Sequence, residues 1–268
     1  MLNYQHIKAR DLPDAWFQTL FRMLEHGSVF TIDRGSYAGQ KRLEFDYVSI
    51  EIEHPSTLPL LPKIESHFNI PNPVADDYLD EYLPYLMTGE LKEGEAYTYG
   101  QLLCKYPIDY PVYAYADPEW KHILIQEMDE LRDRAIIIYE DGQWYLNQIE
   151  LMIWIYKNKG HRNNQMVLQV AHPTDMLLQD PPCLRQIDTR IQDGKLHFYP
   201  YFRSWDLWGG FPANLGGIQL LKEYMASNIV GVEDGQMIAS SKGLHIYDYS
   251  FDLAKCLRMR DDMKLKGE

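Results

Sequence analysis

The sequence contains only three cysteines in 268 residues. Cys104, Cys183 and Cys256 lie far apart along the chain, so neither a disulfide framework nor a zinc pair of the CxxC type is expected. The nine histidines form no HxxxH or HExxH pair, and we assign no metal ligand. Each cysteine is therefore a core residue, a surface residue or a nucleophile.

Long apolar runs and excess positive charge are also absent. No stretch approaches the roughly 18 to 20 apolar residues of a membrane span, and the first residues lack a signal-peptide core. The formal net charge of −13 argues against a nucleic acid or an acidic membrane as partner, because both favour a basic face. We expect a cytoplasmic protein in which any anionic ligand occupies a local arginine pocket.

The hydrophobic pattern predicts an α+β fold with a sheet covered by helices. Residues 43–52 alternate, but the apolar phase shifts at Tyr47, which predicts a strand with a bulge there. Five prolines within 53–76 indicate an irregular connection rather than a domain boundary, so we expect one domain over 1–268. Amphipathic and apolar patterns predict helices at 13–26, 77–88, 118–133 and 148–158, and strands at 135–139 and 166–171.

The pair Asp193-Gly194, between two alternating runs, predicts a β-hairpin with a type I′ turn, because both residues tolerate positive φ. A two-residue loop fixes the register of the whole hairpin. Carried to its open end, this register puts Cys183 opposite Ser204 and beside Arg203.

A guanidinium close to a thiol favours the thiolate, so Arg203 is expected to lower the pKa of Cys183. In ideal register, however, Arg203 faces Leu184 and its side chain leaves the opposite face of the hairpin. A β-bulge would bring the two side chains together, and Pro200, which cannot donate to the ladder, is its expected position. The alternative is that Cys183 is a buried structural thiol and Arg203 a surface charge.

Several motifs resemble, in the same order, the active-site signature of thymidylate synthases. DPPC (180–183) resembles the PPC nucleophile motif, DGKL (193–196) the hairpin, and FRSWDLWGGFPAN (202–214) the RSxD…GxPxN segment. GLHIYDY resembles the HxY motif of the family. AWFQTLFRMLEHG, followed by DRG, resembles its N-terminal helix and phosphate loop. AYTYGQLL is most similar to the corresponding segment of the methanogen-type archaeal branch. The resemblance implies a thymidylate synthase-like α+β fold, with a large mixed β-sheet that has bulges, is covered by helices and forms a homodimer.

The resemblance also assigns a nucleophile and a phosphate site. Cys183 would add to C6 of dUMP, and Arg203 would contact both the substrate phosphate and the cysteine sulfur. Ser204 matches a further phosphate contact, and Arg34 matches the arginine of the phosphate loop. Arg162 lies near an Arg-Arg pair that reaches the phosphate of the partner subunit, although only one arginine is present here.

Other residues match groups that bind the base, the sugar and the cofactor. The Asn214 carboxamide offers a donor and an acceptor that suit O4 and N3–H of uracil, whereas an aspartate would suit cytosine. His245 and Tyr247 share one face of a predicted strand and match the pair that holds the deoxyribose 3′-hydroxyl. Asp206 matches the aspartate that contacts the pterin, and Gly210 is expected to allow close approach to the base.

Tyr99 and Glu81 match groups whose hydrogen bonds organise proton movement at C5 and C4. Glu81 has an alternative interpretation as an exposed helix carboxylate. Two residues depart from the family pattern: Leu184 follows the nucleophile in place of histidine, and Phe202 precedes the arginine in place of glutamine. These changes predict an altered water network beside the base.

The cofactor side departs further from the family pattern. The interval 89–99 is shorter than in bacterial members, which place folate-contacting tryptophans there, and KLKGE lacks the usual apolar C-terminus. Both features favour a tetrahydromethanopterin-type carrier over 5,10-methylenetetrahydrofolate as the methylene-tetrahydropterin.

The resemblance therefore implies a homodimeric C1-transferase, a thymidylate synthase that reductively methylates dUMP to dTMP without a metal. One alternative is a pyrimidine nucleotide hydroxymethylase, in which water rather than hydride ends the reaction. Another is a nucleotide-binding regulatory dimer that has lost turnover.

Overall fold

The computed structural model describes residues 2–33 and 37–267. Its centre is a six-stranded mixed sheet with the strand order β1-β4-β12-β10-β9-β8. The β1–β4 and β10–β12 pairs are parallel, and the other three pairs are antiparallel. The strands are β1 (Tyr4–Ala9), β4 (Tyr47–Ile52), β8 (Val167–Gln169), β9 (Leu184–Gln192), β10 (Lys195–Phe202) and β12 (Glu233–Ser241).

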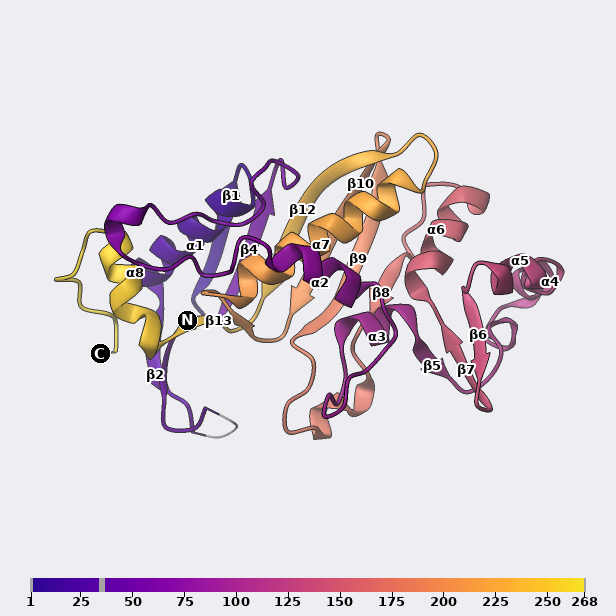
Figure 1. The fold of residues 1–268 in the computed structure, drawn as a ribbon, viewed down its shortest axis with the longest axis horizontal. Coiled ribbons are helices and arrows are strands. Elements are labelled where there is room, and N and C mark those ends of the chain that lie inside the picture. Colours follow the sequence, from indigo (N-terminus) through magenta and orange to yellow (C-terminus); the bar gives the residue numbers. More distant parts are fainter. Residues whose placement is uncertain (1, 34–36, 268) are drawn as a thin grey trace.

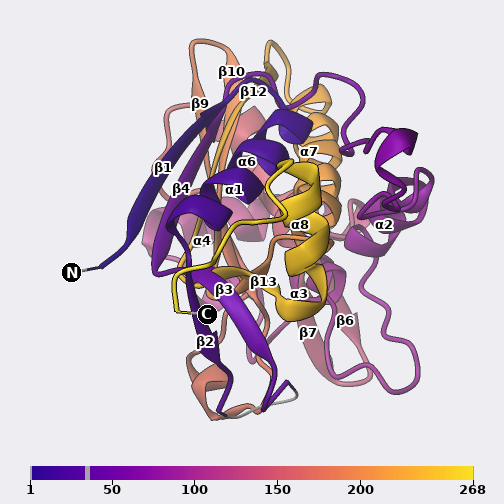
Figure 2. The same cartoon turned by 90° about the vertical axis from the view of Figure 1, so that its left-hand side faces the viewer.

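Helices cover one face of this sheet, and Figure 2 shows α1 and α7 on the same side of it. The helix α1 (Leu12–His26) begins where the Asp11 side chain accepts a hydrogen bond from the Asp14 backbone, and its apolar stripe, including Trp16, is fully buried. This is the expected result of an amphipathic helix with a good N-cap. The other covering helices are α6 (Gln148–Lys159) and α7 (Gly210–Ser227).

A second, four-stranded sheet has the order β11-β13-β3-β2. Its strands are β2 (Ser28–Thr31), β3 (Lys41–Phe45), β11 (Trp205–Asp206) and β13 (Leu244–Tyr247). The predicted single strand with a bulge near Tyr47 is wrong: the chain leaves β3 after Phe45 and enters β4 of the large sheet at Tyr47. The phase of the apolar residues shifts because the two segments lie in different sheets.

A three-stranded sheet, β5-β7-β6, lies near one end of the long axis (Figure 1). It consists of β5 (Tyr106–Ile108), β6 (Ile137–Glu140) and β7 (Gln143–Leu146). The short helices α4 (Pro118–Gln126) and α5 (Met128–Asp133) accompany it, so the predicted helix over 118–133 is divided at Glu127. A smaller hydrophobic core, including Leu131 and Trp154, forms here, and Ile155 packs against both this core and the main one.

The remaining helices are α2 (Tyr78–Leu86), α3 (Tyr99–Cys104) and α8 (Phe251–Leu257). Short 3₁₀ turns connect elements: η1 (Ser66–Phe68), η2 (Val112–Ala114), η3 (Pro173–Leu177) and η4 (Asp248–Ser250). The helix α2 packs so closely on α7 that a Cβ added at Gly217 would lie only 2.3 Å from the Tyr82 ring. The absence of a side chain at Gly217 therefore leaves the space that the Tyr82 ring occupies.

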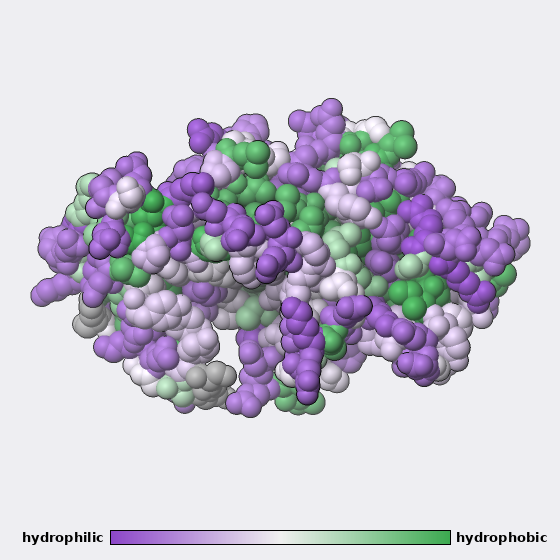
Figure 3. Space-filling model, in the orientation of Figure 1, coloured by the Kyte–Doolittle hydropathy of each residue, from purple (hydrophilic) through white to green (hydrophobic). Residues whose placement is uncertain are grey.

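The expected α+β class, with a large mixed sheet covered by helices, is confirmed. Hydrophilic residues cover much of the face shown in Figure 3, interrupted by smaller apolar patches. Within the described residues, every helix is too short or too polar to span a membrane. In the same part of the chain, no three side chains of His, Cys, Asp or Glu gather as metal ligands do.

Candidate active site

The hairpin β9–β10 carries Cys183 at its open end. Asp193 and Gly194 have φ of 53° and 72°, so the predicted two-residue turn with positive φ is confirmed. The register then shifts between Tyr201 and Phe202, leaving Arg185 as the extra residue on β9. The predicted bulge is thus present, although it lies beyond Pro200.

This bulge changes the residue that faces the cysteine. The Arg203 backbone N–H donates to the Cys183 carbonyl at 2.8 Å, so Arg203, and not Ser204 as the ideal register predicts, lies opposite Cys183. Residues directly opposite in an antiparallel pair point to the same face. The bulge therefore brings the cysteine and the arginine to one side. Ser204 follows in a half-buried position.

Two guanidinium groups hold the Pro-Pro segment before the cysteine. Arg203 Nε donates to the carbonyls of Pro181 at 3.2 Å and Pro182 at 3.1 Å, and its Nη2 lies 3.4 Å from the Asp180 carboxylate. Arg185 Nη1 donates to the Pro182 carbonyl at 3.1 Å. Since both arginines bind backbone oxygens, they fix the path of the chain into the nucleophile.

Arg203 lowers the pKa of Cys183, as expected, but it does not keep the thiol ionised, because the net shift is upward. Burial raises the pKa of this thiol above its usual value, and Arg203 and Arg185 offset only part of that effect while Asp180 adds to it. Desolvation disfavours the thiolate more than the two cations favour it. The cysteine of the ligand-free protein is therefore mainly a protonated thiol at neutral pH.

Tyr99 lies beside the nucleophile at the start of α3, whose N-terminus is capped by Thr98. Its hydroxyl accepts a hydrogen bond from the Leu184 backbone N–H at 3.2 Å. Burial, followed by the nearby Cys183, raises the pKa of Tyr99 well above its usual value. The phenol therefore stays protonated and keeps a proton to donate.

Asn214 extends from α7, and its amide orientation is fixed by two neighbours. The Trp205 indole N–H, which can only donate, donates to Asn214 Oδ1 at 3.1 Å. Asn214 Nδ2 in turn donates to the Tyr82 hydroxyl at 2.8 Å. One acceptor lone pair and one N–H of the amide remain for a ligand.

Asp206, on β11, caps the helix that carries Asn214. Its carboxylate accepts hydrogen bonds from the backbone N–H groups of Trp208, Gly209 and Gly210 at 2.9 to 3.1 Å. A Cβ at Gly210 would lie 3.3 Å from the Asp206 Cβ. The observed close approach at Gly210 is therefore to this carboxylate, and Asp206 has a structural role beside its expected contact with a pterin.

His245 and Tyr247 both extend from β13, and their rings meet edge to face at 4.8 Å between centroids. His245 is 2% exposed, and its Nδ1 lies 2.8 Å from the Gly243 carbonyl. Burial, together with the positive charge of Arg42, lowers the pKa of His245 to about 4. The imidazole is therefore neutral and donates through Nδ1, which leaves Nε2 as a hydrogen-bond acceptor.

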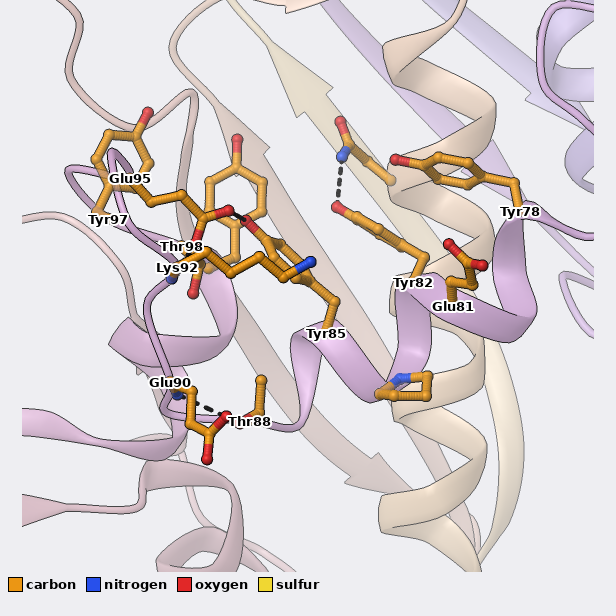
Figure 4. A pocket seen from close by; sticks show the side chains of 13 residues that line it. Tyr78, Glu81, Tyr82, Tyr85, Thr88, Glu90, Lys92, Glu95, Tyr97 and Thr98 are labelled. Atoms are coloured by element: carbon orange, nitrogen blue, oxygen red, sulfur yellow. Dashed lines mark hydrogen bonds between the residues drawn. The ribbon is translucent and has the colours of Figure 1, made fainter.

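Glu81, Tyr99 and Asn214 line one cavity of about 810 Å³. Figure 4 shows this cavity, with Glu81 labelled on α2. Glu81 is exposed, so both interpretations of this residue agree with its place on the cavity wall. The lining is rich in aromatic side chains from α2 and from the segment before α3, namely Tyr78, Tyr82, Tyr85, Tyr97 and Tyr99. It also carries three glutamates and one lysine: Glu81, Glu90, Glu95 and Lys92.

Of the other two arginines expected to bind phosphate, one lies outside the described residues and one does not join this group. Arg34 lies outside the described residues. Arg162 lines a separate cavity of about 430 Å³ near the hairpin turn, together with Arg190. Arg190 is seven residues along the strand from Cys183, which corresponds to about 23 Å, so Arg162 is remote from the nucleophile of its own chain.

Sequence reasoning missed several residues of the site. Tyr82 and Trp205 orient Asn214, and Arg185 holds the segment before the nucleophile. The spacing of the tyrosines at 78, 82 and 85 along one helix was an available signal for the aromatic wall. No sequence signal identified Arg185, because its role depends on the bulge.

Comparison with known proteins gives the class of the protein. The family model described as "Thymidylate synthase" matches residues 109–266. A protein of Methanosarcina acetivorans named "Putative thymidylate synthase" is 31% identical over 93% of this chain and 92% of its own length. A protein of Methanococcoides burtonii with the same name is 33% identical, covering 92% and 91%. A third, from Methanothermobacter thermautotrophicus, is 28% identical over 46% of this chain and 57% of its own.

The chain belongs to the thymidylate synthase family. Similarity to the methanogen proteins extends over most of its length, as the resemblance in the N-terminal and C-terminal motifs predicted.

Proposed function

We propose that the protein is a homodimeric thymidylate synthase that converts dUMP to dTMP with a methylene-tetrahydropterin. The observation that carries this proposal is the pairing of Arg203 with Cys183. Tyr99, which bonds to the residue after the nucleophile, shares a cavity with Asn214, whose fixed amide orientation suits uracil. Family membership supports the same chemistry.

In the proposed reaction, Cys183 Sγ forms a bond to C6 of uracil as the thiol loses its proton. The C5–C6 π electrons move toward C5 and O4, and the Asn214 Nδ2–H is placed to stabilise the charge at O4. The raised pKa of Cys183 means that bound substrate must promote this deprotonation. The buried phenol of Tyr99 would hold or move a proton near the same ring.

The tyrosine-lined cavity fits a pterin. Flat rings stack on tyrosines, and phenol hydroxyls can bond to ring nitrogen atoms, while Asn214 links the cavity to the substrate site. A methylene-tetrahydropterin, when bound, supplies the one-carbon unit and the hydride. The glutamates of the lining disfavour a carrier with carboxylates close to its ring, which supports the tetrahydromethanopterin type.

Two features support the homodimer. The face of the large sheet away from the helices carries partly exposed aromatic side chains, including Tyr47, Tyr199 and Tyr201. Such a face is suited to a second copy. Arg162 lies beside Arg190 near the hairpin turn, too far from Cys183 to serve the phosphate of its own site, which favours a role at the partner's site. Nothing in this scheme requires a membrane, and we propose a cytoplasmic enzyme.

The test is incubation with 5-fluoro-dUMP and each candidate methylene donor, followed by mass measurement of the intact protein. A covalent ternary adduct on the wild type, absent in Cys183→Ala, supports the proposal and identifies the donor. No adduct with any donor contradicts it. Product analysis with dUMP then distinguishes the two reactions, because a 5-hydroxymethyl product would show a hydroxymethylase. Release of tritium from 5-tritiated dUMP would exclude a regulatory protein that has lost turnover.

A further inference from the structure

A row of polar side chains crosses the four-stranded sheet. Asp206 on β11 pairs with His245 on β13, His245 with Glu44 on β3, and Glu44 with Ser28 on β2. Residues paired in register share a face of the sheet. Glu44 and His245 are therefore cross-strand neighbours on the face that carries the expected sugar-binding pair.

Arg42 stands two residues from Glu44 and so shares its face. Arg42 Nε and Glu44 Oε2 lie 2.9 Å apart, with side-chain exposures of 25% and 15%. Tyr247 is the partner of Arg42 in register. In this block of four residues, each member of the expected sugar-binding pair has a charged cross-strand neighbour: Glu44 beside His245, and Arg42 beside Tyr247.

Three atoms of this block lack a hydrogen bond. Arg42 Nε, Glu44 Oε2 and His245 Nε2 are each buried and make no hydrogen bond in the described part of the chain, although the first two lie within ion-pair distance of each other. Leaving a buried polar atom without a hydrogen bond is unfavourable. One donor and two acceptors in the same place are suited to a group that can both donate and accept.

The turn before β13 holds this geometry. Gly243 has a φ of +73°, and a Cβ there would lie 3.3 Å from Glu44 Oε2. Its carbonyl accepts the hydrogen bond from His245 Nδ1. The Glu44 carboxylate therefore lies against the same turn that directs His245 Nε2 away from Gly243.

We propose that Arg42 and Glu44 form, with His245, the site for a sugar hydroxyl of the nucleotide, and that Glu44 is a specificity-determining residue there. The hydroxyl accepts from Arg42 Nε–H and donates to the Glu44 carboxylate or to His245 Nε2. This proposal rests on the proposed function, since it names the group that recognises the 3′-hydroxyl of dUMP.

The charge state of Glu44 makes this recognition dependent on pH. Burial, opposed by the charge of Arg42 and assisted by that of Asp46, raises the pKa of Glu44 to about 7. The other groups that face it are the neutral His245 on β13 and, beyond His245, Asp206 on β11; β2 contributes Ser28. Above about pH 7 the ionised carboxylate accepts a charge-assisted hydrogen bond, which is stronger than one to the protonated acid.

The test compares binding of dUMP with that of 2′,3′-dideoxyuridine 5′-monophosphate, which lacks only the 3′-hydroxyl, by calorimetry. The two ligands carry the same phosphate, so its titration cancels in the ratio of their dissociation constants. For the wild type we expect dUMP to bind on the order of tenfold more tightly at pH 8.5, with the ratio falling toward pH 6. In Glu44→Gln the ratio should be smaller than in the wild type at pH 8.5 and should no longer change with pH, because the titrating carboxylate is gone.

The matched control is Glu51→Gln on β4, a glutamate paired with Lys8 at 3.4 Å in the other sheet, which should keep the wild-type ratio. If Glu44→Gln does not fold, as judged by circular dichroism, Arg42→Lys replaces it and should also reduce the ratio. An unchanged, pH-dependent ratio in the folded variant overturns this inference alone. Failure of the wild type to bind either nucleotide overturns the proposed function as well.

Discussion

The backbone of Arg203 pairs with that of Cys183 through an N–H···O bond of 2.8 Å, yet the Arg203 guanidinium binds the carbonyls of Pro181 and Pro182. The arginine thus both faces the nucleophile and fixes the segment before it. Its positive charge favours the thiolate without outweighing the effect of burial on the pKa of Cys183.

This arrangement predicts slow alkylation of Cys183 by iodoacetamide at pH 7. Because only the thiolate reacts and burial raises the pKa of the thiol, the rate should rise about tenfold per pH unit up to and beyond pH 9. Arg203→Met should slow the reaction further, since it removes a charge that lowers this pKa. Peptide mass mapping resolves Cys183 from the other cysteines, and a rate that is already constant at pH 7 would contradict the prediction.

The Tyr82 hydroxyl is the acceptor that holds the Asn214 amide. We expect Tyr82→Phe to weaken dUMP binding about fivefold, because a hydrogen bond of this kind contributes about 1 kcal/mol. Tyr78→Phe is a matched control on the same helix: its ring stacks on Tyr82 at 5.4 Å, and no hydrogen bond of its hydroxyl is found in the described structure. Equal losses in the two variants would show that Tyr82 acts only through its ring.

Much of the fold was predictable because the signals are local. The Asp193-Gly194 turn set the hairpin register over most of its length. Asn147 followed three residues later by Glu150 is the sequence pattern of a capping box, and Asn147 does cap α6 through a hydrogen bond from the Glu150 backbone. The Glu150 side chain does not complete a capping box; it accepts hydrogen bonds from Arg134 and Tyr224. Contacts with residues far along the chain therefore replaced the local contact of the Glu150 side chain that a capping box requires.

The remaining errors arise from tertiary structure. Periodicity detected the change of face at Tyr47 but could not distinguish a bulge from a passage between two sheets. Spacing suggested that Arg203 is close to Cys183, whereas the sign of the pKa shift depends on how deeply the thiol is buried. The contact of Arg42 and Glu44 with His245 and Tyr247 could not be predicted, because β3 and β13 pair across about two hundred residues of chain.

Asp206 should contribute to stability as well as to any cofactor contact. Its carboxylate accepts three backbone N–H groups at the start of α7, and loss of such a cap typically costs about 1–2 kcal/mol. We expect Asp206→Ala to reduce the free energy of unfolding by that amount in urea titrations. Asp206→Asn, which keeps one acceptor oxygen, should lose less. Equal stability of the alanine variant and the wild type would refute the structural role.

The buried Lys222 provides a stability prediction with a defined sign. Its ammonium is fully buried, donates to the carbonyls of Gly235 and Gln236, and lies 3.4 Å from Asp234. Burial lowers the pKa of Lys222 to about 8 from 10.5, so the unfolded chain binds this proton more tightly than the folded protein. Between about pH 8 and 10.5 the wild type should therefore gain stability relative to Lys222→Met, by about 1.4 kcal/mol per pH unit at most. Urea titrations of both proteins at pH 7.5, 8.5 and 9.5 measure the difference in free energy of unfolding between them. The contributions of ionisable groups that both proteins contain cancel in this difference. A difference that stays constant or declines across that window would mean that Lys222 is not held in the folded protein as a desolvated ammonium.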